Sequence, residues 1–511
     1  MSDTASASST PAGAGLSPAP RAAPRFSRFT RATRWARRMT FLVHRWLGIA
    51  LALLMSVWAL SGFVLMYVPY PETTAGERVA GLDPLDLTAC CEALTPPAGP
   101  VEAAAVEMLL GRPVLRAIGP FGPELLPLDS GPGFVIGERE AGAIARTHMR
   151  RAFGAEPFVR VGRVEVDQWT LQHRRYAPLW KVSVADGRGT VLYVSGLSGE
   201  VVQDTHRSER FWNWLGAVPH WLYFTPLRQD GALWSQVVIW ASVLGTFLTL
   251  TGIYVGLRMY GRGKRKSPFR GVALWHHWTG LIFGLVTLTW VFSGLASMQP
   301  WGWLESDGPG EELQALAGRP LEATDAAALV AALAAHPLPG VVSAEVTVQG
   351  GKPWAILVRS DGSRLRAALP GLAPAPPSSA DLAAIAARAR PGAPIVEQGL
   401  IREGDAYYYY SHHNRERHFP AWRVIYGDAE STRLYLDPRT GELAGFVDDG
   451  SRGFRWWHLA LHRLDIPGLR ERPLWDLVTL PLLSGVSLVC LLGAWMGLRR
   501  LRRTERARRR Q

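Results

Sequence analysis

The sequence predicts an α-helical membrane protein, a four-span bundle from a tandem duplication, with two periplasmic α+β modules. Three observations predict this fold class. An apolar stretch that begins at His44 returns at His276 with the same spacing of key residues. Two further apolar stretches occur, and each is long enough to cross a bilayer, which needs roughly 20 residues. Arginine and lysine crowd beside the apolar stretches.

The repeated stretch carries the clearest signal. Residues 44–66 read HRWLGIALALLMSVWALSGFVLM, and residues 276–298 read HHWTGLIFGLVTLTWVFSGLASM. A histidine, two tryptophans, a glycine, a Ser-Gly pair and a methionine stand at matching offsets in both copies. Each half then contains an even number of spans, so we expect the halves to be related by a pseudo-twofold axis along the membrane normal.

The charge distribution indicates topology. The formal net charge is +13, and the basic residues concentrate in residues 21–38, 258–270 and 499–510. All three stretches fall on one side of a four-span protein, which the positive-inside rule makes the cytoplasmic side. We therefore expect no nucleic-acid partner, although basic tails often have one. The three cysteines form no C-x-x-C or C-x-x-C-H motif, so covalent c-type haem attachment is not expected.

The first segments of the chain alternate between membrane and soluble composition. Residues 1–38 are rich in Ala, Ser, Pro and Arg, which predicts a disordered, basic cytoplasmic tail. The first span, 41–67, is too long for the apolar core of a signal peptide, so we expect it to be retained. Residues 70–210 have alternating strand patterns and form the first module. Residues 211–232 are aromatic, as is typical of the membrane interface.

The remaining segments repeat this order. They are a second span at 233–257, a basic cytoplasmic loop at 258–271, a third span at 272–298, a second periplasmic module at 300–450, an interfacial histidine segment at 454–473, a fourth span at 474–498 and a basic cytoplasmic tail at 499–511. The modules share a motif, LYVSGLSGEVV from residue 192 and LYLDPRTGELA from residue 434. Its Gly-Glu step predicts a turn before another strand, a purely structural role.

Four histidines recur across the two halves. His44 and His276, which we call the inner pair, lie at the cytoplasmic starts of spans one and three. His220 and His462, the outer pair, lie just before spans two and four. Paired neutral imidazoles at bilayer depth suit the axial positions of a b-type haem iron, held between facing helices. We therefore predict two haems b, one at each level; the alternative is that these histidines anchor helix ends at the interface.

Two further histidines leave the ligand assignment open. His277 adjoins His276, and His458 lies four residues before His462 on the same helix face, so either could ligate instead. Arg45 and Arg463 directly follow ligand candidates and could reach haem propionates, or extend to the interface. Zinc is less favoured, because neither level offers a nearby carboxylate or thiolate.

At this point the sequence resembles a known family. HRWLG at His44, HHWTG at His276 and LHRLD around His462 resemble the PepSY-associated transmembrane proteins of bacteria, over roughly residues 38–500. The soluble modules resemble PepSY domains in pattern. The resemblance implies a multi-pass protein of the bacterial inner membrane, with both termini cytoplasmic, that binds haem through His44, His220, His276 and His462. Some members of the family reduce ferric siderophores at the periplasmic face. AVPHWLYF around His220 stands where the family more often has a Leu-His-Arg-like step.

These observations predict a transmembrane electron conduit, a haem-dependent oxidoreductase of the ferric-chelate reductase type. The cytoplasmic segments are too short for a flavin or nicotinamide domain and carry no G-x-G-x-x-G fingerprint. The donor must then be separate, either the quinone pool or a soluble reductase. The acceptor would be a ferric siderophore or another ferric chelate, and outer-sphere reduction needs no catalytic acid, base or nucleophile. The alternative from another class is a non-catalytic PepSY sensor or scaffold that binds a periplasmic ligand or protein.

Overall fold

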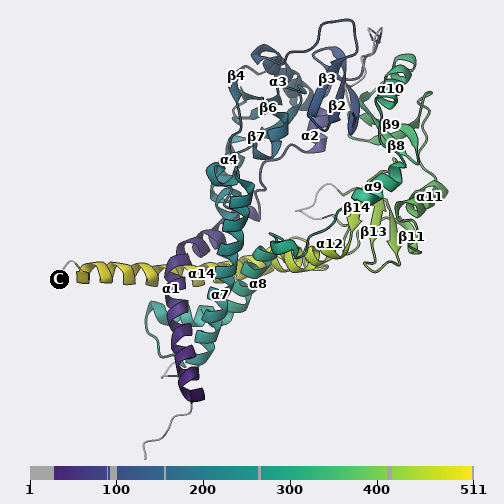
Figure 1. Cartoon of the computed structure of the whole chain (residues 1–511). Helices are drawn as coiled ribbons and strands as arrows, with labels where there is room; N and C mark the ends of the chain where they lie inside the picture. The colour runs from purple at the N-terminus through teal and green to yellow at the C-terminus, as the bar shows by residue number, and fades with distance from the viewer. Residues whose placement is uncertain are drawn as a thin grey trace, which may run out of the picture.

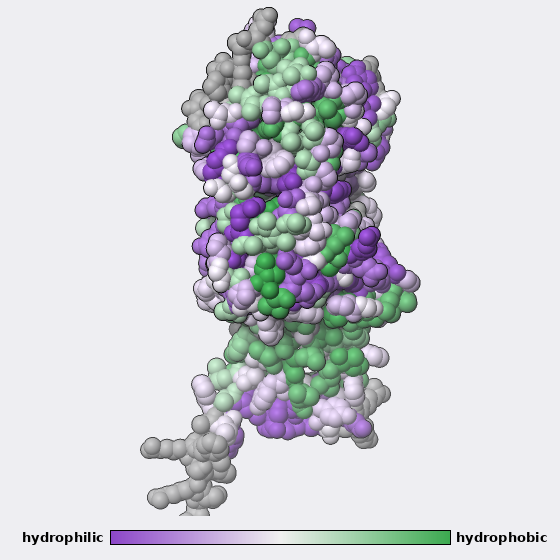
Figure 2. Space-filling view, turned by 90° about the vertical axis from the view of Figure 1, so that its right-hand side faces the viewer, coloured by the Kyte–Doolittle hydropathy of each residue, from purple (hydrophilic) through white to green (hydrophobic). Residues whose placement is uncertain are grey.

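Four long apolar helices form the membrane part of the protein. The computed structural model describes residues 28–88, 90–91, 100–154, 157–262, 266–410 and 417–508, so most of the predicted N-terminal tail and the last residues of the C-terminal tail lie outside the described part. The helices are α1 (Arg28–Leu65), α7 (Gly231–Met259), α8 (Val272–Ala296) and α14 (Leu474–Arg508). All four are long and apolar enough to cross a bilayer, which confirms the predicted number of spans. Figure 2 shows their side chains as an apolar band below the mixed surface of the soluble part.

Two of the helices extend far beyond the predicted spans, and α7 exceeds its predicted span by two residues at each end. Helix α1 starts at Arg28, inside the tail predicted to be disordered, and α14 continues to Arg508. The sequence after residue 28 contains no proline or glycine before the membrane, and arginine and alanine favour helix. Elongating an existing helix avoids a new nucleation cost, so the basic flanks stay helical.

Helices α1 and α14 run antiparallel. At the basic end, the Arg500 guanidinium lies 5.9 Å from the ring centre of Trp46. At the other end, the Tyr67 hydroxyl donates to Asp476 at 3.0 Å. The C-terminus of α1 and the N-terminus of α14 therefore lie at the same end of the bundle, beside the soluble modules (Figure 1).

The strands of both halves join in one central sheet. Its order is β10-β9-β8-β1-β2-β3, and β1 pairs with β8 in antiparallel orientation. The strands are β1 (Ala103–Leu109), β2 (Arg112–Gly119), β3 (Gly122–Pro127), β8 (Val341–Gln349), β9 (Lys352–Arg359) and β10 (Arg364–Ala368). The two predicted modules are therefore not separate bodies. Pairing β1 with β8 covers two strand edges that would otherwise be open to other chains.

The register of this sheet is symmetric. Ala105 lies opposite Glu345 in the β1–β8 ladder. These two positions are equivalent when the hairpin turns at 109–112 and 349–352 are superimposed. The central sheet thus has a local twofold axis between Ala105 and Glu345, in agreement with the repeated order of elements in the two halves.

Each half also has a four-stranded antiparallel sheet packed on one helix. The orders are β4-β5-β6-β7 and β11-β12-β13-β14. The strands are β4 (Val159–Val164), β5 (Leu179–Val184), β6 (Val191–Ser195), β7 (Val201–Thr205), β11 (Ile395–Ile401), β12 (Ala421–Tyr426), β13 (Arg433–Leu436) and β14 (Leu443–Val447). Apolar residues of α3 (Glu138–Phe153) and α11 (Ser379–Ala389) pack on the first and second of these sheets. Each module thus combines a sheet with a helix, in agreement with the predicted α+β composition.

Short helices complete the fold. They are α2 (Ala75–Ala80), α4 (Arg207–Leu215), α5 (Ala217–His220), α6 (Thr225–Arg228), α9 (Gly310–Ala317), α10 (Ala323–Ala335), α12 (Asp449–Phe454), α13 (Leu461–Arg463), the 3-10 turns η1 (Leu171–Tyr176) and η2 (Pro300–Gly302), and the π-helical turn η3 (Arg455–Ala460). Helices α4 to α6 in one half, and α12, η3 and α13 in the other, carry the chain from the modules to the spans.

The repeated Gly-Glu step joins each four-stranded sheet to the central sheet. Gly199 and Gly441 have φ of +66° and +75°, which confirms the predicted turns. A Cβ at Gly199 would lie 3.0 Å from Leu109, and a Cβ at Gly441 would lie 3.0 Å from Gln349. Because both contacts fall on the last residue of a central strand, the two turns dock at equivalent places.

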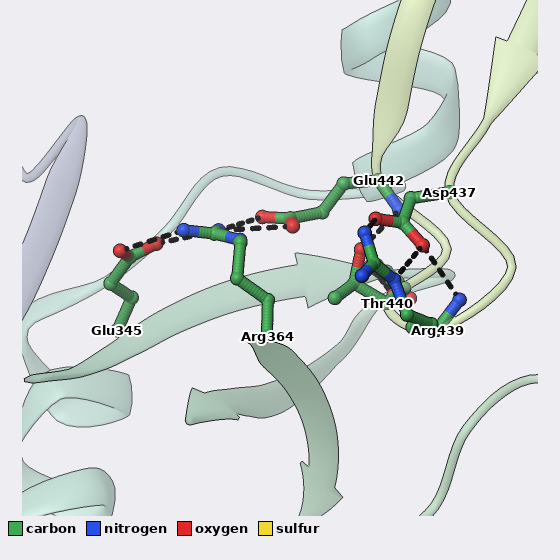
Figure 3. A network of polar contacts seen from close by, with 7 residues as sticks. Glu345, Arg364, Asp437, Arg439, Thr440 and Glu442 are labelled. Atoms are coloured by element: carbon green, nitrogen blue, oxygen red, sulfur yellow. Dashed lines mark hydrogen bonds and ion pairs between the residues drawn. The ribbon is translucent and has the colours of Figure 1, made fainter. Parts of the chain in front are cut away.

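The glutamate of each step adds an ion pair to this docking. Glu200 accepts a hydrogen bond from Arg78 at 2.8 Å, and Arg78 also binds Glu107 of β1 at 3.0 Å. In the second half, Arg364 lies between Glu442 and Glu345, at 3.0 and 2.9 Å (Figure 3). The Gly-Glu step therefore has a second structural role besides the turn, because its carboxylate binds an arginine that also pairs with a glutamate of the central sheet.

Candidate functional site

The inner pair is held by the spans that face it. His44 of α1 places Nδ1 3.2 Å from the carbonyl oxygen of Leu248 in α7. His276 of α8 places Nδ1 3.1 Å from the carbonyl oxygen of Val489 in α14. The two histidines thus make the same contact, each with the second span of its own half.

Glycines make room for both inner rings. A Cβ at Gly252 would lie 2.7 Å from Cε1 of His44, and a Cβ at Gly493 would lie 3.3 Å from Cε1 of His276. Neither glycine was predicted from the repeated histidine stretch. A signal was present, since Gly252 and Gly493 each begin a G-x-x-x-G-L-R motif in the second span of a half.

The outer pair is held by the repeated Ser-Gly steps of α1 and α8. Nδ1 of His220 lies 3.0 Å from Oγ of Ser61. Nδ1 of His462 lies 3.1 Å from Oγ of Ser293 and 3.1 Å from the carbonyl oxygen of Trp290. The glycine after each serine leaves space for the ring, because a Cβ at Gly62 would lie 3.9 Å from His220 and one at Gly294 would lie 3.6 Å from His462.

These contacts fix the tautomer of the histidines. A carbonyl oxygen can only accept, so Nδ1 of His44, His276 and His462 must carry the hydrogen. Ser61 already donates to the carbonyl of Val57 at 2.7 Å, so its oxygen accepts from His220. A neutral ring with a hydrogen on Nδ1 keeps its lone pair on Nε2, the arrangement found in histidines that bind metals.

The outer rings are neutral at physiological pH. Burial lowers the pKa of His220 to about 4 and places that of His462 well below its ordinary value. Neutral imidazole is the form that ligates metals. Nε2 of each ring makes no hydrogen bond with the described residues.

The separation of the outer rings suits a shared metal ion. The ring centres of His220 and His462 are 6.1 Å apart, and the ring planes cross at 72°. Two imidazoles that bind one ion at about 2.0–2.1 Å on opposite sides have ring centres roughly 6 Å apart. The ring-centre distance of the outer pair therefore matches what two histidines on one metal ion would need.

His277 is committed to hydrogen bonds. Its Nδ1 lies 2.9 Å from Oγ of Ser267, and its Nε2 lies 2.9 Å from the carbonyl oxygen of Gly256. Both nitrogens of this buried ring are occupied, so neither is available to a metal. Of the two adjacent histidines, His276 is the one whose contacts leave Nε2 open.

His458 lies beside the outer pair. Its ring stacks on that of His462, with centres 5.1 Å apart and planes at 28°. Nδ1 of His458 lies 3.0 Å from the carbonyl oxygen of Ser293. Stacked rings cannot occupy opposite sides of one ion, so His458 suits a place beside the ligand. His462 has the partners that match those of His220.

The two arginines that follow ligand candidates, Arg463 and Arg45, lie in different surroundings. The Arg463 guanidinium makes no hydrogen bond or ion pair with the described residues, and burial lowers its pKa. Arg45 is exposed at the basic end of α1. No group of three or more His, Cys, Asp or Glu side chains suited to a metal ion occurs within the described ranges. The metal-binding potential of the site therefore rests on histidine pairs.

Apolar side chains fill the bundle between the two levels. Met55, Ala59, Leu248, Val486 and Cys490 are buried there. Trp58 and Trp290, which occupy matching positions in the repeat, pack against this cluster. His44 and Ser61 are separated by 17 residues of one helix, which at 1.5 Å per residue places the levels about 25 Å apart.

The structure thus defines a class, a multi-pass membrane protein with symmetric histidine pairs at two depths of a four-helix bundle. The family model described as "PepSY-associated TM region" matches residues 41–359 and 273–510. The chain therefore belongs to the PepSY-associated transmembrane family, as its histidine motifs predicted. A comparison with curated proteins found no significant match.

Proposed function

We propose that this protein is a di-haem b electron carrier of the bacterial inner membrane that reduces an acceptor at the face of its soluble modules. The observation that supports this most strongly is the shared geometry of four histidines. Each directs Nδ1 to an oxygen of a span, and the outer two stand 6.1 Å apart. A single interfacial histidine needs no such arrangement, whereas two pairs of axial ligands do.

Bound haem would supply one-electron transfer, and the protein would supply its position and surroundings. His44 and His276 would hold one haem, and His220 and His462 the other. Buried apolar residues between the levels would keep water away, which limits the reorganisation that accompanies each transfer. Arg463, which has no partner among the described side chains, fits a propionate carboxylate at the outer level.

The orientation of flow follows from charge. The inner pair lies toward the end of the bundle where Arg500 contacts Trp46, and basic ends face the cytoplasm. The outer pair lies where the modules meet the spans. Electrons would therefore enter from a separate cytoplasmic or quinone donor. They would leave at the periplasmic face to a ferric siderophore or another ferric chelate, whose Fe³⁺ takes up one electron to become Fe²⁺.

A visible spectrum of the purified full chain tests this proposal. We expect a reduced-minus-oxidised difference spectrum of the b type and about two haems per chain by the pyridine haemochrome assay. Reduced protein mixed with a ferric chelate should then be reoxidised. Protein expressed with ample haem that contains none would overturn the proposal and favour a non-catalytic sensor or scaffold of the same family.

A further inference from the structure

An aspartate turn organises the soluble module of each half. Oδ1 of Asp167 accepts from the backbone N–H of Trp169 at 3.0 Å, and Oδ1 of Asp405 accepts from that of Tyr407 at 2.8 Å. Oδ2 of each aspartate accepts from a tyrosine hydroxyl at 2.7 Å, from Tyr193 and Tyr435 respectively. Both tyrosines are fully buried in a four-stranded sheet. The two turns are therefore fixed to their sheets in the same way.

From the second turn, a tyrosine reaches the segment that carries His462. The hydroxyl of Tyr409 donates to Oδ2 of Asp465 at 2.8 Å, and both side chains are buried. Asp465 lies three residues after His462. The module is thereby tied by one buried hydrogen bond to the chain immediately beyond the outer histidine.

Two arginines enclose this contact. Arg455 donates to the carbonyl oxygens of Asp465 at 2.6 Å and Ala406 at 3.1 Å. The guanidinium groups of Arg455 and Arg470 lie 4.9 and 4.0 Å from the ring centre of Tyr409. Because Arg455 precedes His462 and Asp465 follows it, both flanks of the histidine are fixed to the module. We call Tyr409, Asp465, Arg455 and Arg470 the clasp.

The first half has a contact at the same spacing. Nε2 of Gln168 donates to the carbonyl oxygen of Tyr223 at 2.5 Å, and Tyr223 lies three residues after His220. Oε1 of Gln168 accepts from the hydroxyl of Thr225 at 2.8 Å. Gln168 belongs to the turn at Asp167, as Tyr409 belongs to the turn at Asp405. In both halves, then, the module holds the chain three residues beyond an outer histidine.

The local backbone explains why such a tie is needed. His462 lies in α13, the last turn of a continuous helical segment formed by α12, η3 and α13, which ends at Arg463; the next residue, Leu464, has a φ of +50°. The last carbonyl groups of a helix have no partner within the helix, so its final turn is the part that frays most readily. Left-handed backbone at a leucine is also unfavourable and persists only where the surroundings impose it.

We propose that Tyr409 and Asp465 are positioning residues that set the orientation of the His462 ring at the outer level. This inference rests on the proposed haem function. Residues that orient a metal ligand typically change metal affinity by about 10–100-fold when they are replaced. The clasp contacts only the segment that carries His462, so replacing a clasp residue should leave the inner pair unchanged.

The experiment compares Tyr409→Phe with Tyr408→Phe in the full chain. Tyr408 is an adjacent buried tyrosine, but its hydroxyl donates to the carbonyl oxygen of His418 at 3.1 Å, within the module. Each variant therefore loses one buried hydroxyl contact, and only one of them touches the histidine segment. The readouts are the electron paramagnetic resonance signals of the two oxidised haems and the rate of haem transfer to excess apomyoglobin.

We expect Tyr409→Phe to shift the signal of one haem and to speed the loss of that haem about tenfold or more, as for other ligand-orienting residues. The other haem should be unchanged, and Tyr408→Phe should match the wild type in both readouts. Wild-type behaviour of both haems in Tyr409→Phe would overturn the inference.

A second measurement does not depend on haem. Amide hydrogen exchange of residues 455–465 in haem-free protein should be faster in Tyr409→Phe than in Tyr408→Phe. If the wild type binds no haem, the proposed function fails, and this measurement still shows whether the clasp holds the segment. Equal exchange in both variants would overturn the positioning role.

Discussion

Pairs of residues, rather than single residues, define the candidate site. His44 and His276 each direct Nδ1 to a carbonyl oxygen of a neighbouring span. His277 instead uses both nitrogens in hydrogen bonds. Among the described residues, the same side chain at adjacent positions of one helix therefore leaves Nε2 without a hydrogen bond in one case and uses it in a hydrogen bond in the other.

This difference gives the first prediction. His44→Ala and His276→Ala should each remove the inner haem, because one axial ligand rarely retains a low-spin haem, and should lower haem per chain by about half. His277→Ala should keep both haems and lose only its contacts with Ser267 and Gly256. The pyridine haemochrome assay measures all three variants. Full haem content in His44→Ala would show that the inner pair is not a ligand pair.

Gly252 permits a second prediction. A methyl group at this position would lie 2.7 Å from the His44 ring, whereas one at Gly497 would meet Ile49 at an ordinary 3.5 Å. Gly252→Ala should displace the ring and shift or remove the inner haem signal, while Gly497→Ala should preserve it. The visible and paramagnetic resonance spectra report the difference. Identical spectra for the two variants would show that the ring needs no such space.

At the scale of elements, the central sheet depends on a buried carboxylate. Glu107 of β1 is fully buried and accepts hydrogen bonds from Arg78 at 3.0 Å, Arg116 at 2.8 Å and Ser343 of β8 at 3.1 Å. Burial by itself raises the pKa of this carboxyl group, but the two guanidinium groups outweigh it and hold the pKa below its ordinary value of 4.5. Glu107 thus links the two halves beside the local twofold axis.

We predict that Glu107→Gln lowers the free energy of unfolding of the soluble part by about 3 kcal/mol, because it breaks a buried ion pair. A carboxyl group whose folded pKa is depressed stabilises the fold above its unfolded pKa, and this stabilisation is lost as the pH falls through the folded pKa. The difference between wild type and variant should therefore be constant above about pH 5 and shrink below pH 4.5.

Thermal unfolding of the full chain at a series of pH values tests this, with Glu345→Gln as the control. Glu345 lies in the neighbouring strand, but its side chain is 32% exposed and pairs with Arg364. Exposed pairs contribute about 1 kcal/mol or less, so this variant should unfold near the wild-type temperature. A pH-independent deficit in Glu107→Gln would show that its carboxylate is not the titrating group.

The sequence predicts the elements better than their pairing. Hydropathy and alternation locate the four spans and strands such as β5 and β12. Alternation does not predict strands β1 to β3, because β1 and β2 are buried along most of their length and their residues do not alternate between buried and exposed. The ladder between β1 and β8 joins segments far apart in the chain, so no local pattern specifies it.

The same limit applies to the candidate site. The repeat identifies His44, His220, His276 and His462, and it includes Ser61 and Ser293 without revealing that they contact the outer pair. Which atom faces a histidine depends on how the spans are rotated against each other, and packing determines this. The Asp167 and Asp405 turns stand in dissimilar sequence, DQWTL and DAYYY, so only the structure relates them.

At the scale of the whole molecule, the two levels lie in series between the basic end of the bundle and the modules. About 25 Å of helix, by the rise of 1.5 Å per residue, separates the two levels along α1. Within the described residues, α5 contacts α1 and α13 contacts α8, and both contacts lie at the outer level. A haem at the outer level would therefore be within reach of an acceptor on the modules, and a haem at the inner level would not.

This arrangement predicts that His462 and His458, which lie next to each other at the outer level, have different roles. His462→Ala should remove the outer haem and block reduction of an added ferric chelate, while the inner haem is still reduced by its donor. His458→Ala should retain both haems, because its ring stacks beside the ligand, and should reduce the chelate with at most a modest loss of rate. Stopped-flow absorbance, with the inner and outer haems followed separately, measures both steps. Chelate reduction at the wild-type rate in His462→Ala would mean that electrons leave by another route, and the order of the levels proposed here would be wrong.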